Sequence, residues 1–448
     1  MAKKIAVIGA GLAGIMAAYT AAKKGADVSL YEKNPMIGRK LIYVPWDTCH
    51  LTHTGGINDF VENYSRGAEF MRHSLEKFGF KKAMKFFEEL GVDTETDDNG
   101  AVSPSNEPSE LQKALDKKLR DLGVRIYLSS KIQDIIKDGK KVKGIKVHNQ
   151  IKEYDKIIIA TGGLARPKLG ASEDGYRFAE KLGHTIIEPK PSNSEIDTED
   201  KIGKYLRGMR VSPVRIGVYQ NHKKIIERNG EVIFTIHGLA GDTILFLSGT
   251  IARLMDKGKV EISIDLVPDK PRELLERELR AKSSNLNHYL VGEVLGNYID
   301  KRIVPILTRF TRIRDNKPMN HITNLERKGL LLFMKDFRVT VKRVKPFYAA
   351  LYTSGGIDVM EVNPKSMESK LVKGLYFCGE VLDIESGPGG YNLHSAWATG
   401  FSAGNAASRG AKKTKAVTKK AKGKVKKLTK NVSKGGKVKD DTSSIAVA

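Results

Sequence analysis

The hydrophobic pattern at the start of the chain predicts a strand, a glycine-rich turn, a helix and a second strand. Residues 5–8 form a continuous apolar, mostly β-branched run, which suits a strand buried in a parallel sheet. The alanine-rich residues 15–24 suit a helix packed closely on that sheet, and residues 27–32 form the next strand. This order is typical of a doubly wound α/β fold.

The same α/β pattern continues to about residue 190. Helical periodicity and short apolar strands occupy 60–90, 109–122, 124–128, 142–147 and 157–159. The pattern returns near the end of the chain, with a strand and turn at 374–379 and a helix at 392–408. We therefore expect the two parts to fold together.

Between about residues 191 and 346 the pattern changes. Alternating apolar and polar positions predict antiparallel strands, which include 214–219, 232–236 and 260–264. Residues 272–307 have a helical pattern. A doubly wound domain interrupted by an inserted domain accounts for this order.

Domain boundaries follow from these changes. We predict a discontinuous doubly wound domain at 1–190 and 346–408, an inserted domain at 191–345 and a Lys-rich tail at 409–448. The tail lacks aromatic residues and is too polar to bury a core, so we expect disorder. It holds 14 basic and 2 acidic residues, which supplies +12 of the net charge of +25.

Composition narrows the class of protein further. The 448 residues are 40% hydrophobic and 29% charged, as in ordinary globular proteins. No run of about 18 apolar residues is present, so we expect no membrane span. Cys49 and Cys378 are too few for a disulfide framework, which favours a cytoplasmic protein. Cys378 lies inside an apolar strand and is expected in the core.

The first glycine-rich turn has the spacing Gly9-x-Gly11-x-x-Gly14 between a strand and a helix. The first glycine permits a tight turn, the second lets the backbone approach a pyrophosphate, and the third lets helix and strand pack closely. Glu32 follows at the end of the next strand, where a carboxylate can accept hydrogen bonds from ribose hydroxyls. These residues predict a dinucleotide site.

A second glycine turn indicates a flavin rather than a nicotinamide as the resident cofactor. Residues 374–383 form a strand with an acid past its end, where Glu380 or Asp383 can meet a ribityl hydroxyl. The turn at 387–392 opens the last helix, whose free N–H groups suit the flavin N1/C2=O edge. We assign to the flavin end Gly379, Glu380, Gly389, Gly390, Tyr391 and Asn392. No second Gly-x-Gly-x-x-Gly motif follows a strand, so NAD(P)H is expected to bind only transiently.

Together with further motifs, these turns resemble the bacterial flavoprotein family called HI0933-like or aminoacetone-oxidase-like. The other motifs are Gly38-Arg39-Lys40, 160–164, 167–168, 174–176, 237–241, 353–358 and 367–371. The similarity covers nearly all of residues 1–408. The resemblance implies FAD in an extended pose on a glutathione-reductase-like Rossmann domain, with an inserted β-barrel and helical region covering the active site.

The resemblance also implies cofactor residues and an activity. It adds Arg39 and Lys40 near the pyrophosphate, and Thr161 and Gly162 at the end of a strand, to the FAD-binding set. Members of this family include rRNA dihydrouridine synthases, reductases of conjugated C=C bonds and, by an older label, amine oxidases. These reductions share transfer of hydride from reduced flavin N5 to an electron-poor carbon.

One loop departs from the family pattern. Where the family has a run of glycines and an arginine, this chain has Pro45, Trp46, Asp47 and Thr48. Bulky side chains there would reshape the ring pocket or exclude part of the cofactor.

The catalytic candidates are Cys49, His50 and Tyr391. Cys49 or a neighbouring histidine would protonate the carbon next to the one that receives hydride. Cys49, His50 and His53 also have the spacing of a partial metal site, although no partner cluster completes it, so we expect no metal. A third interpretation is a polar loop with one buried cysteine. Tyr391 either faces the flavin or packs at the helix start.

The basic residues predict a polyanionic partner. The tail lysines most suited to phosphate contacts are Lys412, Lys413, Lys419, Lys420, Lys426 and Lys427. The insertion adds basic stretches at 302–314 and 338–345. A solubilising tail is the alternative, and a membrane surface is disfavoured because no apolar face accompanies the lysines. A homodimer is possible.

The sequence therefore predicts an FAD-dependent oxidoreductase that reduces a C=C bond, with uridine in ribosomal RNA as the favoured substrate. Two alternatives remain open. One is a flavoenzyme acting on a small enone or amine, and the other is a nucleic-acid-binding homologue that has lost catalysis.

Overall fold

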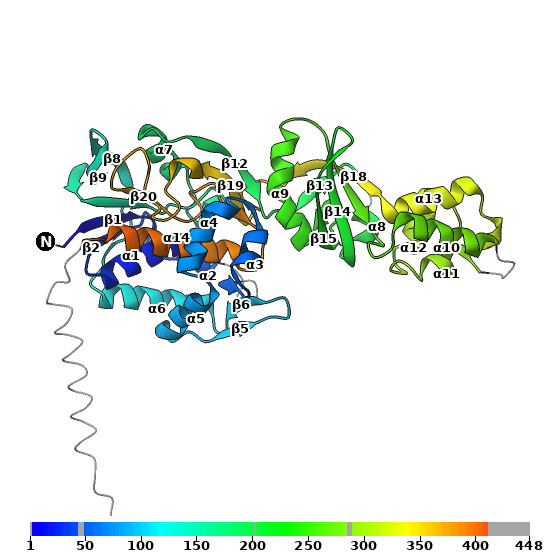
Figure 1. Cartoon of the computed structure of the whole chain (residues 1–448), viewed down its shortest axis with the longest axis horizontal. Coiled ribbons are helices and arrows are strands. Elements are labelled where there is room, and N and C mark those ends of the chain that lie inside the picture. The colour runs from blue at the N-terminus through cyan, green and yellow to red at the C-terminus, as the bar shows by residue number, and fades with distance from the viewer. Residues whose placement is uncertain (1, 44–48, 201–202, 285–288, 411–448) are drawn as a thin grey trace, which may run out of the picture.

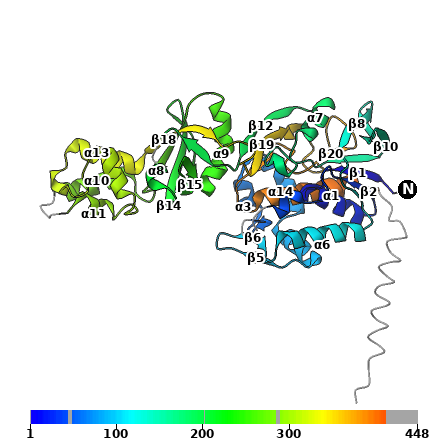
Figure 2. The ribbon, with the colours of Figure 1, turned by 180° about the vertical axis from the view of Figure 1, so that it is seen from behind.

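The computed structural model describes residues 2–43, 49–200, 203–284 and 289–410. A parallel sheet with its covering helices forms one end of an elongated molecule, a barrel lies in the middle, and a group of helices forms the far end (Figure 1). The view from behind shows the same order (Figure 2). The predicted tail lies outside the described residues from residue 411 onward, and so does the loop at 44–48.

A five-stranded parallel sheet is the centre of the first part. Its strands, in spatial order, are β20 (Leu375–Phe377), β11 (Lys156–Ile159), β1 (Lys4–Ile8), β2 (Asp27–Tyr31) and β7 (Arg125–Tyr127). Every neighbouring pair is parallel, and Val7 lies opposite Ile158 on one side and Leu30 on the other. The last segment of the chain thus completes a sheet that the first segment begins, as the sequence predicts.

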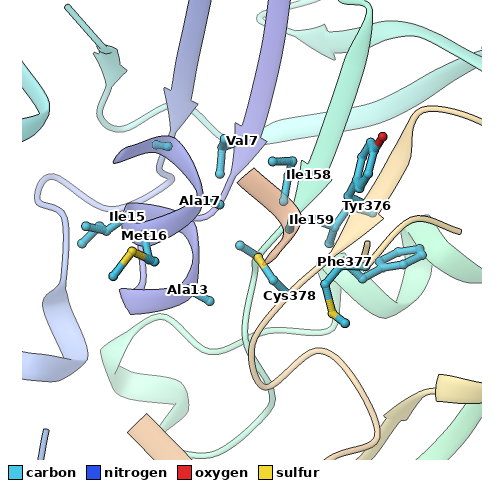
Figure 3. Close-up of a cluster of buried hydrophobic side chains, with 14 of the residues drawn as sticks. Val7, Ala13, Ile15, Met16, Ala17, Ile158, Ile159, Tyr376, Phe377 and Cys378 are labelled. Carbon is cyan, nitrogen blue, oxygen red and sulfur yellow. The ribbon is translucent and has the colours of Figure 1, made fainter. Parts of the chain in front are cut away.

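Two helices cover this sheet and pack closely on each other. They are α1 (Leu12–Lys23) and α14 (Tyr391–Ala407). A Cβ at Gly400 would lie 2.3 Å from the carbonyl oxygen of Ala13, so only glycine permits this approach. Figure 3 shows the core that results, in which Val7, Met16 and Cys378 lie among other buried side chains. Cys378 is fully buried, as expected.

Smaller elements surround the sheet. They are α2 (Arg39–Ile42), β3 (Thr52–His53), α3 (Ile57–Glu62), β4 (Tyr64–Arg66), α4 (Ala68–Lys77), α5 (Phe80–Leu90), β5 (Thr94–Thr96), β6 (Ala101–Pro104), α6 (Pro108–Asp121), β8 (Ile132–Asp138), β9 (Lys141–Val147), β10 (Gln150–Glu153), α7 (Asp174–Lys181), β12 (Ile186–Ser192), β19 (Tyr352–Ile357) and β21 (Glu385–Ser386). Strands β3 and β21 lie near the start of α14, where the second glycine turn is found.

The central part is a closed six-stranded barrel. In spatial order its strands are β13 (Ile196–Thr198), β16 (Gly238–Ala240), β15 (Lys223–Phe234), β14 (Arg210–Gln220), β17 (Val260–Asp265) and β18 (Phe337–Val344). Helix α9 (Asp242–Met255) packs both against the barrel and against β12 of the first part. The barrel thus adjoins the sheet domain through α9.

The far end consists of helices inserted between β17 and β18. They are α10 (Arg272–Ser284), α11 (Val291–Leu295), α12 (Val304–Thr311) and α13 (Asn324–Lys335). The barrel and these helices share one hydrophobic core. We expected the helical region to cover the active site together with the barrel. This expectation is wrong, because the barrel separates the helices from the sheet domain (Figure 1).

Other predicted elements differ in their details. The helical pattern at 60–90 is divided into α3, α4 and α5, because Gly67 takes a left-handed conformation at the start of α4 and Gly79 starts α5. Helix α9 was missed because it is buried on most of its faces and therefore lacks a polar stripe. Within the described ranges, none of the helices combines the length and apolarity needed to cross a membrane.

Candidate functional site

The first glycine turn links β1 to α1 and has the geometry that its spacing predicts. Gly9 adopts φ +99°, and a Cβ there would lie 2.4 Å from the carbonyl oxygen of Ala160. A Cβ at Gly14 would lie 1.9 Å from the carbonyl oxygen of Gly9. At Gly11, in contrast, a Cβ would meet nothing within 4 Å. Two of the glycines are needed for packing, and the third borders open space.

That open space lies at the N-terminus of α1. No side chain in the described part of the chain caps this helix, so N–H groups of its first turn and the positive end of its dipole can meet an anion. The arrangement suits a pyrophosphate, which is what the motif predicts.

Glu32 is held beside the same turn. Its Oε2 accepts the backbone N–H of Ala10 at 2.8 Å, and its Oε1 accepts two N–H groups of Asn34 at 2.8 and 2.6 Å. A carboxylate oxygen accepts about two hydrogen bonds, so Oε2 retains capacity for a hydroxyl. Its predicted role toward ribose stays a prediction, with the carboxylate positioned for it.

Arg39 and Lys40 lie at the start of α2. Arg39 donates to the side chain of Asn34 at 3.0 Å. Lys40 forms an ion pair of 3.3 Å with Oε2 of Glu380, which joins two predicted cofactor residues from opposite ends of the chain. Lys40 therefore connects α2 to the residue that follows β20, whereas Arg39 is held by a residue just past β2.

Three buried polar atoms that have no hydrogen-bond partner among the described residues cluster past the ends of β11 and β20. They are Thr161 Oγ1, Tyr176 Oη and Glu380 Oε1. A Cβ at Gly175 would lie 1.9 Å from Thr161 Oγ1, and burial and the charge of Glu380 raise the pKa of Tyr176.

Buried polar atoms are normally hydrogen-bonded, because burial without a partner is unfavourable. A ligand chain that carries several hydroxyls would satisfy all three atoms. The cluster therefore fits the ribityl chain of a flavin. Tyr176 was not among the predicted site residues, although its motif was part of the family resemblance.

The structure also distinguishes between Glu380 and Asp383, the two acids that the sequence offered as partners of a ribityl hydroxyl. Arg66 donates to both carboxylate oxygens of Asp383. Arg66 thus engages both oxygens of Asp383, whereas Glu380 pairs with Lys40 through Oε2 and keeps an Oε1 without a partner among the described residues. Gly379 lets the turn after β20 approach α1, because a Cβ there would lie 2.7 Å from the Ala13 Cβ. Glu380 is the acid better placed for a ribityl hydroxyl.

The second glycine turn is built around Gly389 and Gly390, which both have positive φ. A Cβ at Gly390 would lie 2.1 Å from the carbonyl oxygen of Thr52. The Asn392 side chain accepts from Ser386 Oγ at 2.8 Å and donates to the Ser386 carbonyl at 3.1 Å. The Asn392 side chain therefore holds the turn in shape, and its predicted role in cofactor binding stays a prediction.

Tyr391 forms an aromatic pair at this turn. Its ring stacks on His53 with centroids 4.4 Å apart. Burial raises the pKa of Tyr391 to about 12, so the phenol keeps its proton at neutral pH. Its proposed catalytic role stays a prediction.

Cys49 and His50 follow the loop whose residues 44–48 lie outside the described part. Cys49 is 1% exposed and belongs to the core of the sheet domain. Burial raises the pKa of its thiol to about 12, which is far from that of an efficient acid near neutral pH. This placement favours packing over catalysis for Cys49, whereas His50 is partly exposed and stays a candidate. Among the described residues, no three His, Cys, Asp or Glu side chains group as metal ligands.

His394 on the first turn of α14 has a structural role. Its Nε2 donates to the carbonyl of Phe78 at 2.9 Å, so its Nδ1 accepts from Thr52 Oγ1 at 2.7 Å. Burial lowers its pKa to about 4. The neutral imidazole thus ties α14 to β3.

Sequence reasoning missed a buried polar network where the barrel meets the sheet domain. Glu385 is fully buried and accepts hydrogen bonds from Ser192 and Ser354. Arg253 of α9 lies 3.5 Å from its carboxylate. A Cβ at Gly249 would lie 2.0 Å from Glu385 Oε1, so the glycine makes room for the carboxylate. The sequence carries no signal for this network, because Arg253 and Glu385 are far apart in the chain and only the fold brings them together.

The parallel sheet with its glycine turn, together with the unpartnered atoms that suit a ribityl chain, defines an FAD-dependent oxidoreductase of the Rossmann type. The family model described as "HI0933-like protein Rossmann domain" matches residues 3–406. The chain belongs to this family of flavoproteins.

Three curated relatives match over nearly their whole length. A 3-dehydro-bile acid delta(4,6)-reductase of Clostridium scindens is 28% identical over 90% of this chain and 98% of its own. A ribosomal RNA dihydrouridine synthase of Haemophilus influenzae is 26% identical over 90% of this chain and 98% of its own. Its namesake in Escherichia coli is 25% identical over 88% of this chain and 95% of its own.

Proposed function

We propose that the protein reduces a carbon–carbon double bond conjugated to a carbonyl group, and that its substrate is uridine in ribosomal RNA. The observation that carries the proposal is the full-length similarity to relatives named as rRNA dihydrouridine synthases and as a bile acid reductase. Conversion of uridine to dihydrouridine saturates a ring double bond next to a carbonyl. The names of the three relatives thus describe one type of reduction.

The residues of this chain would hold FAD, which supplies the hydride when bound. The turn at 9–14 and the N-terminus of α1 would hold the pyrophosphate. Thr161, Tyr176 and Glu380 would bind the ribityl hydroxyls. The turn at 387–392 would face the ring. NAD(P)H would bind transiently as the electron donor.

Charge supports RNA as the substrate. The chain carries a net charge of +25. Within the basic stretches, Arg302, Arg338, Arg343 and Lys345 form ion pairs with carboxylates.

Three arginines at the far end of the molecule, where the inserted helices lie, have no such pairing. Among the described residues, Arg309, Arg312 and Arg314 are exposed and pair with no carboxylate. Arg309 lies 4.6 Å from the ring of Tyr205, and Phe310 beside it is 50% exposed. Arginines interleaved with exposed aromatic rings suit an RNA chain. The six tail lysines named above would add phosphate contacts from outside the described residues.

Deletion of the gene is expected to remove dihydrouridine from one position of ribosomal RNA. Mass spectrometry of rRNA fragments from the deletion strain and its parent measures this. A plasmid copy of the gene should restore the modification, and a copy with Gly11→Val should not, because that change targets flavin binding. Unchanged dihydrouridine in the deletion strain contradicts the rRNA substrate.

A second candidate is reduction of a small enone. The reductase relative supports it, being 28% identical to this chain. With the small enone as substrate, turnover is expected to be independent of residues 409–448 and insensitive to added rRNA. With RNA as substrate, removing residues 409–448 should weaken rRNA binding and flatten its dependence on salt. Parallel kinetics of the full and shortened chains, with cyclohexenone and with rRNA transcripts, distinguish the two.

A further inference from the structure

Arg228 of strand β15 extends from the barrel to the second glycine turn. Its Nη2 donates to the side-chain oxygen of Asn63 at 2.6 Å, and its guanidinium carbon lies 3.8 Å from the centre of the Phe246 ring.

Asn63 and Phe246, the two partners of Arg228, both lie against the second glycine turn. The backbone carbonyl of Asn63 accepts the N–H of Gly387 at 3.0 Å. A Cβ at Gly387 would lie 2.8 Å from the Phe246 ring. Arg228 is therefore fixed beside the first residue of the turn that is predicted to face the flavin ring.

The charge of this arginine is not neutralised locally. Arg228 is half-buried, and no carboxylate of the described residues pairs with it. Other arginines of the barrel have such partners, for example Arg210 with Glu231 and Arg343 with Asp197. Burial lowers the pKa of Arg228, which reflects the cost of keeping its charge away from water. A partly desolvated cation without a counter-charge is suited to an oxygen ligand that carries or develops negative charge.

Its donors are also largely free. A guanidinium has five N–H groups. One donates to Asn63, and no other hydrogen bond of this side chain is formed within the described residues. The stacked rings of His53 and Tyr391 border the same turn, with ring atoms 3.7 and 3.8 Å from where a Cβ of Gly389 would be. Aromatic faces and a forked donor thus surround the same turn, an arrangement that suits a flat ring with a carbonyl group.

We propose that Arg228 binds the carbonyl oxygen of the conjugated substrate and stabilises the negative charge that forms on it. This inference rests on the proposed function. Hydride adds to the β-carbon, the π electrons of the double bond move toward the carbonyl, and its oxygen becomes an enolate. A proton then adds to the α-carbon, so the substrate gains two electrons and two hydrogens. Reduced flavin supplies the electron pair, as in the proposed function.

The same arginine would serve either substrate class. Uridine and a cyclic enone both have a carbonyl oxygen conjugated to the double bond that is reduced. The proposed role of Arg228 therefore concerns the conjugated carbonyl group, which the two candidate substrates have in common.

A phenolate tests this without turnover, because a phenolate oxygen on a flat ring resembles the enolate. The flavin-loaded full chain is titrated with para-chlorophenol, and the change of the flavin visible spectrum gives the dissociation constant. Arg228→Met is expected to weaken binding at least about tenfold, because it removes a hydrogen bond between charged groups. Arg228→Lys keeps the positive charge but lacks the forked guanidinium, so its dissociation constant should lie between those of the unchanged protein and Arg228→Met. Arg210→Met, the same replacement on an exposed barrel arginine, should bind within about twofold of the unchanged protein.

Flavin content, measured in every variant, separates substrate binding from cofactor binding, and all variants should keep their flavin. The proposal is overturned if the unchanged protein does not bind the phenolate, if Arg228→Met binds it within twofold, or if that variant loses its flavin. If rRNA keeps its dihydrouridine in the deletion strain while Arg228→Met weakens phenolate binding, the RNA substrate fails and the role of Arg228 stands.

Discussion

Replacing Gly11 with valine is expected to give a folded protein that binds no flavin. A Cβ at this position would meet nothing within 4 Å, so we expect the protein itself to tolerate the valine, apart from a small loss at the start of α1. The valine would fill the space in which the pyrophosphate approaches the backbone. Loss of two charge-assisted hydrogen bonds weakens binding by about 3 kcal/mol or more, which is at least about 100-fold.

The measurement is an absorbance spectrum in buffer and again after adding FAD. The unchanged protein should be yellow, with a flavin absorbance band at about 450 nm. Gly11→Val should stay colourless, and its circular dichroism spectrum should match that of the unchanged protein. A colourless unchanged protein that takes up no FAD would instead support the nucleic-acid-binding alternative.

Two further glycine replacements calibrate this result. Gly329→Val, in α13 at the far end, also points into open space and should keep its flavin. Gly9→Val should fail to fold, because φ is +99° and the Cβ would lie 2.4 Å from a carbonyl oxygen. Full flavin content in Gly11→Val would contradict the assignment of this turn to the pyrophosphate.

Replacing Arg253 with methionine is expected to lower the free energy of unfolding by about 3–5 kcal/mol near neutral pH, because it leaves the Glu385 carboxylate buried without its counter-charge. Thermal or urea unfolding measures the change. Arg120→Met, which removes an exposed ion pair with Asp116, should cost no more than about 0.5 kcal/mol.

The loss should depend on pH in a defined direction. Burial already raises the pKa of Glu385 in the folded protein above its usual 4.5. A folded state that holds the proton more tightly than the unfolded state loses stability as pH rises from the unfolded pKa through the folded one. Removing Arg253 raises the folded pKa further, so the variant should be closest to the unchanged protein at about pH 5 and fall behind toward about pH 8.

A double variant checks the cause. Glu385→Gln added to Arg253→Met removes the buried charge, so stability should partly recover and its dependence on pH should diminish. A loss in Arg253→Met that is the same at every pH would mean that lost packing, rather than the charge on Glu385, is responsible.

The parts of the site that the sequence predicted are those formed by residues close together in the chain. A Cβ at Gly14 would collide with the carbonyl oxygen of Gly9 in the same turn, so the spacing of these two glycines predicts the shape of the turn. Helix α9 escaped prediction because it is buried on most of its sides. Its sequence therefore has no polar face of the kind that marks a surface helix. Cys49 appeared as a catalytic candidate because it lies in a polar stretch of sequence, which does not reveal that its side chain is buried.

By itself the sequence determined the doubly wound fold, the dinucleotide turn, the second glycine turn and the family, because local spacing and hydrophobic periodicity encode them. Only the tertiary structure decided between the two acids: Arg66 engages both oxygens of Asp383, whereas Oε1 of Glu380 has no partner among the described residues. It also placed Arg228, which pairs with no carboxylate of the described residues, beside the second glycine turn. These choices depend on contacts between segments far apart in the chain, whose partners are selected by packing and by the cost of burying charge.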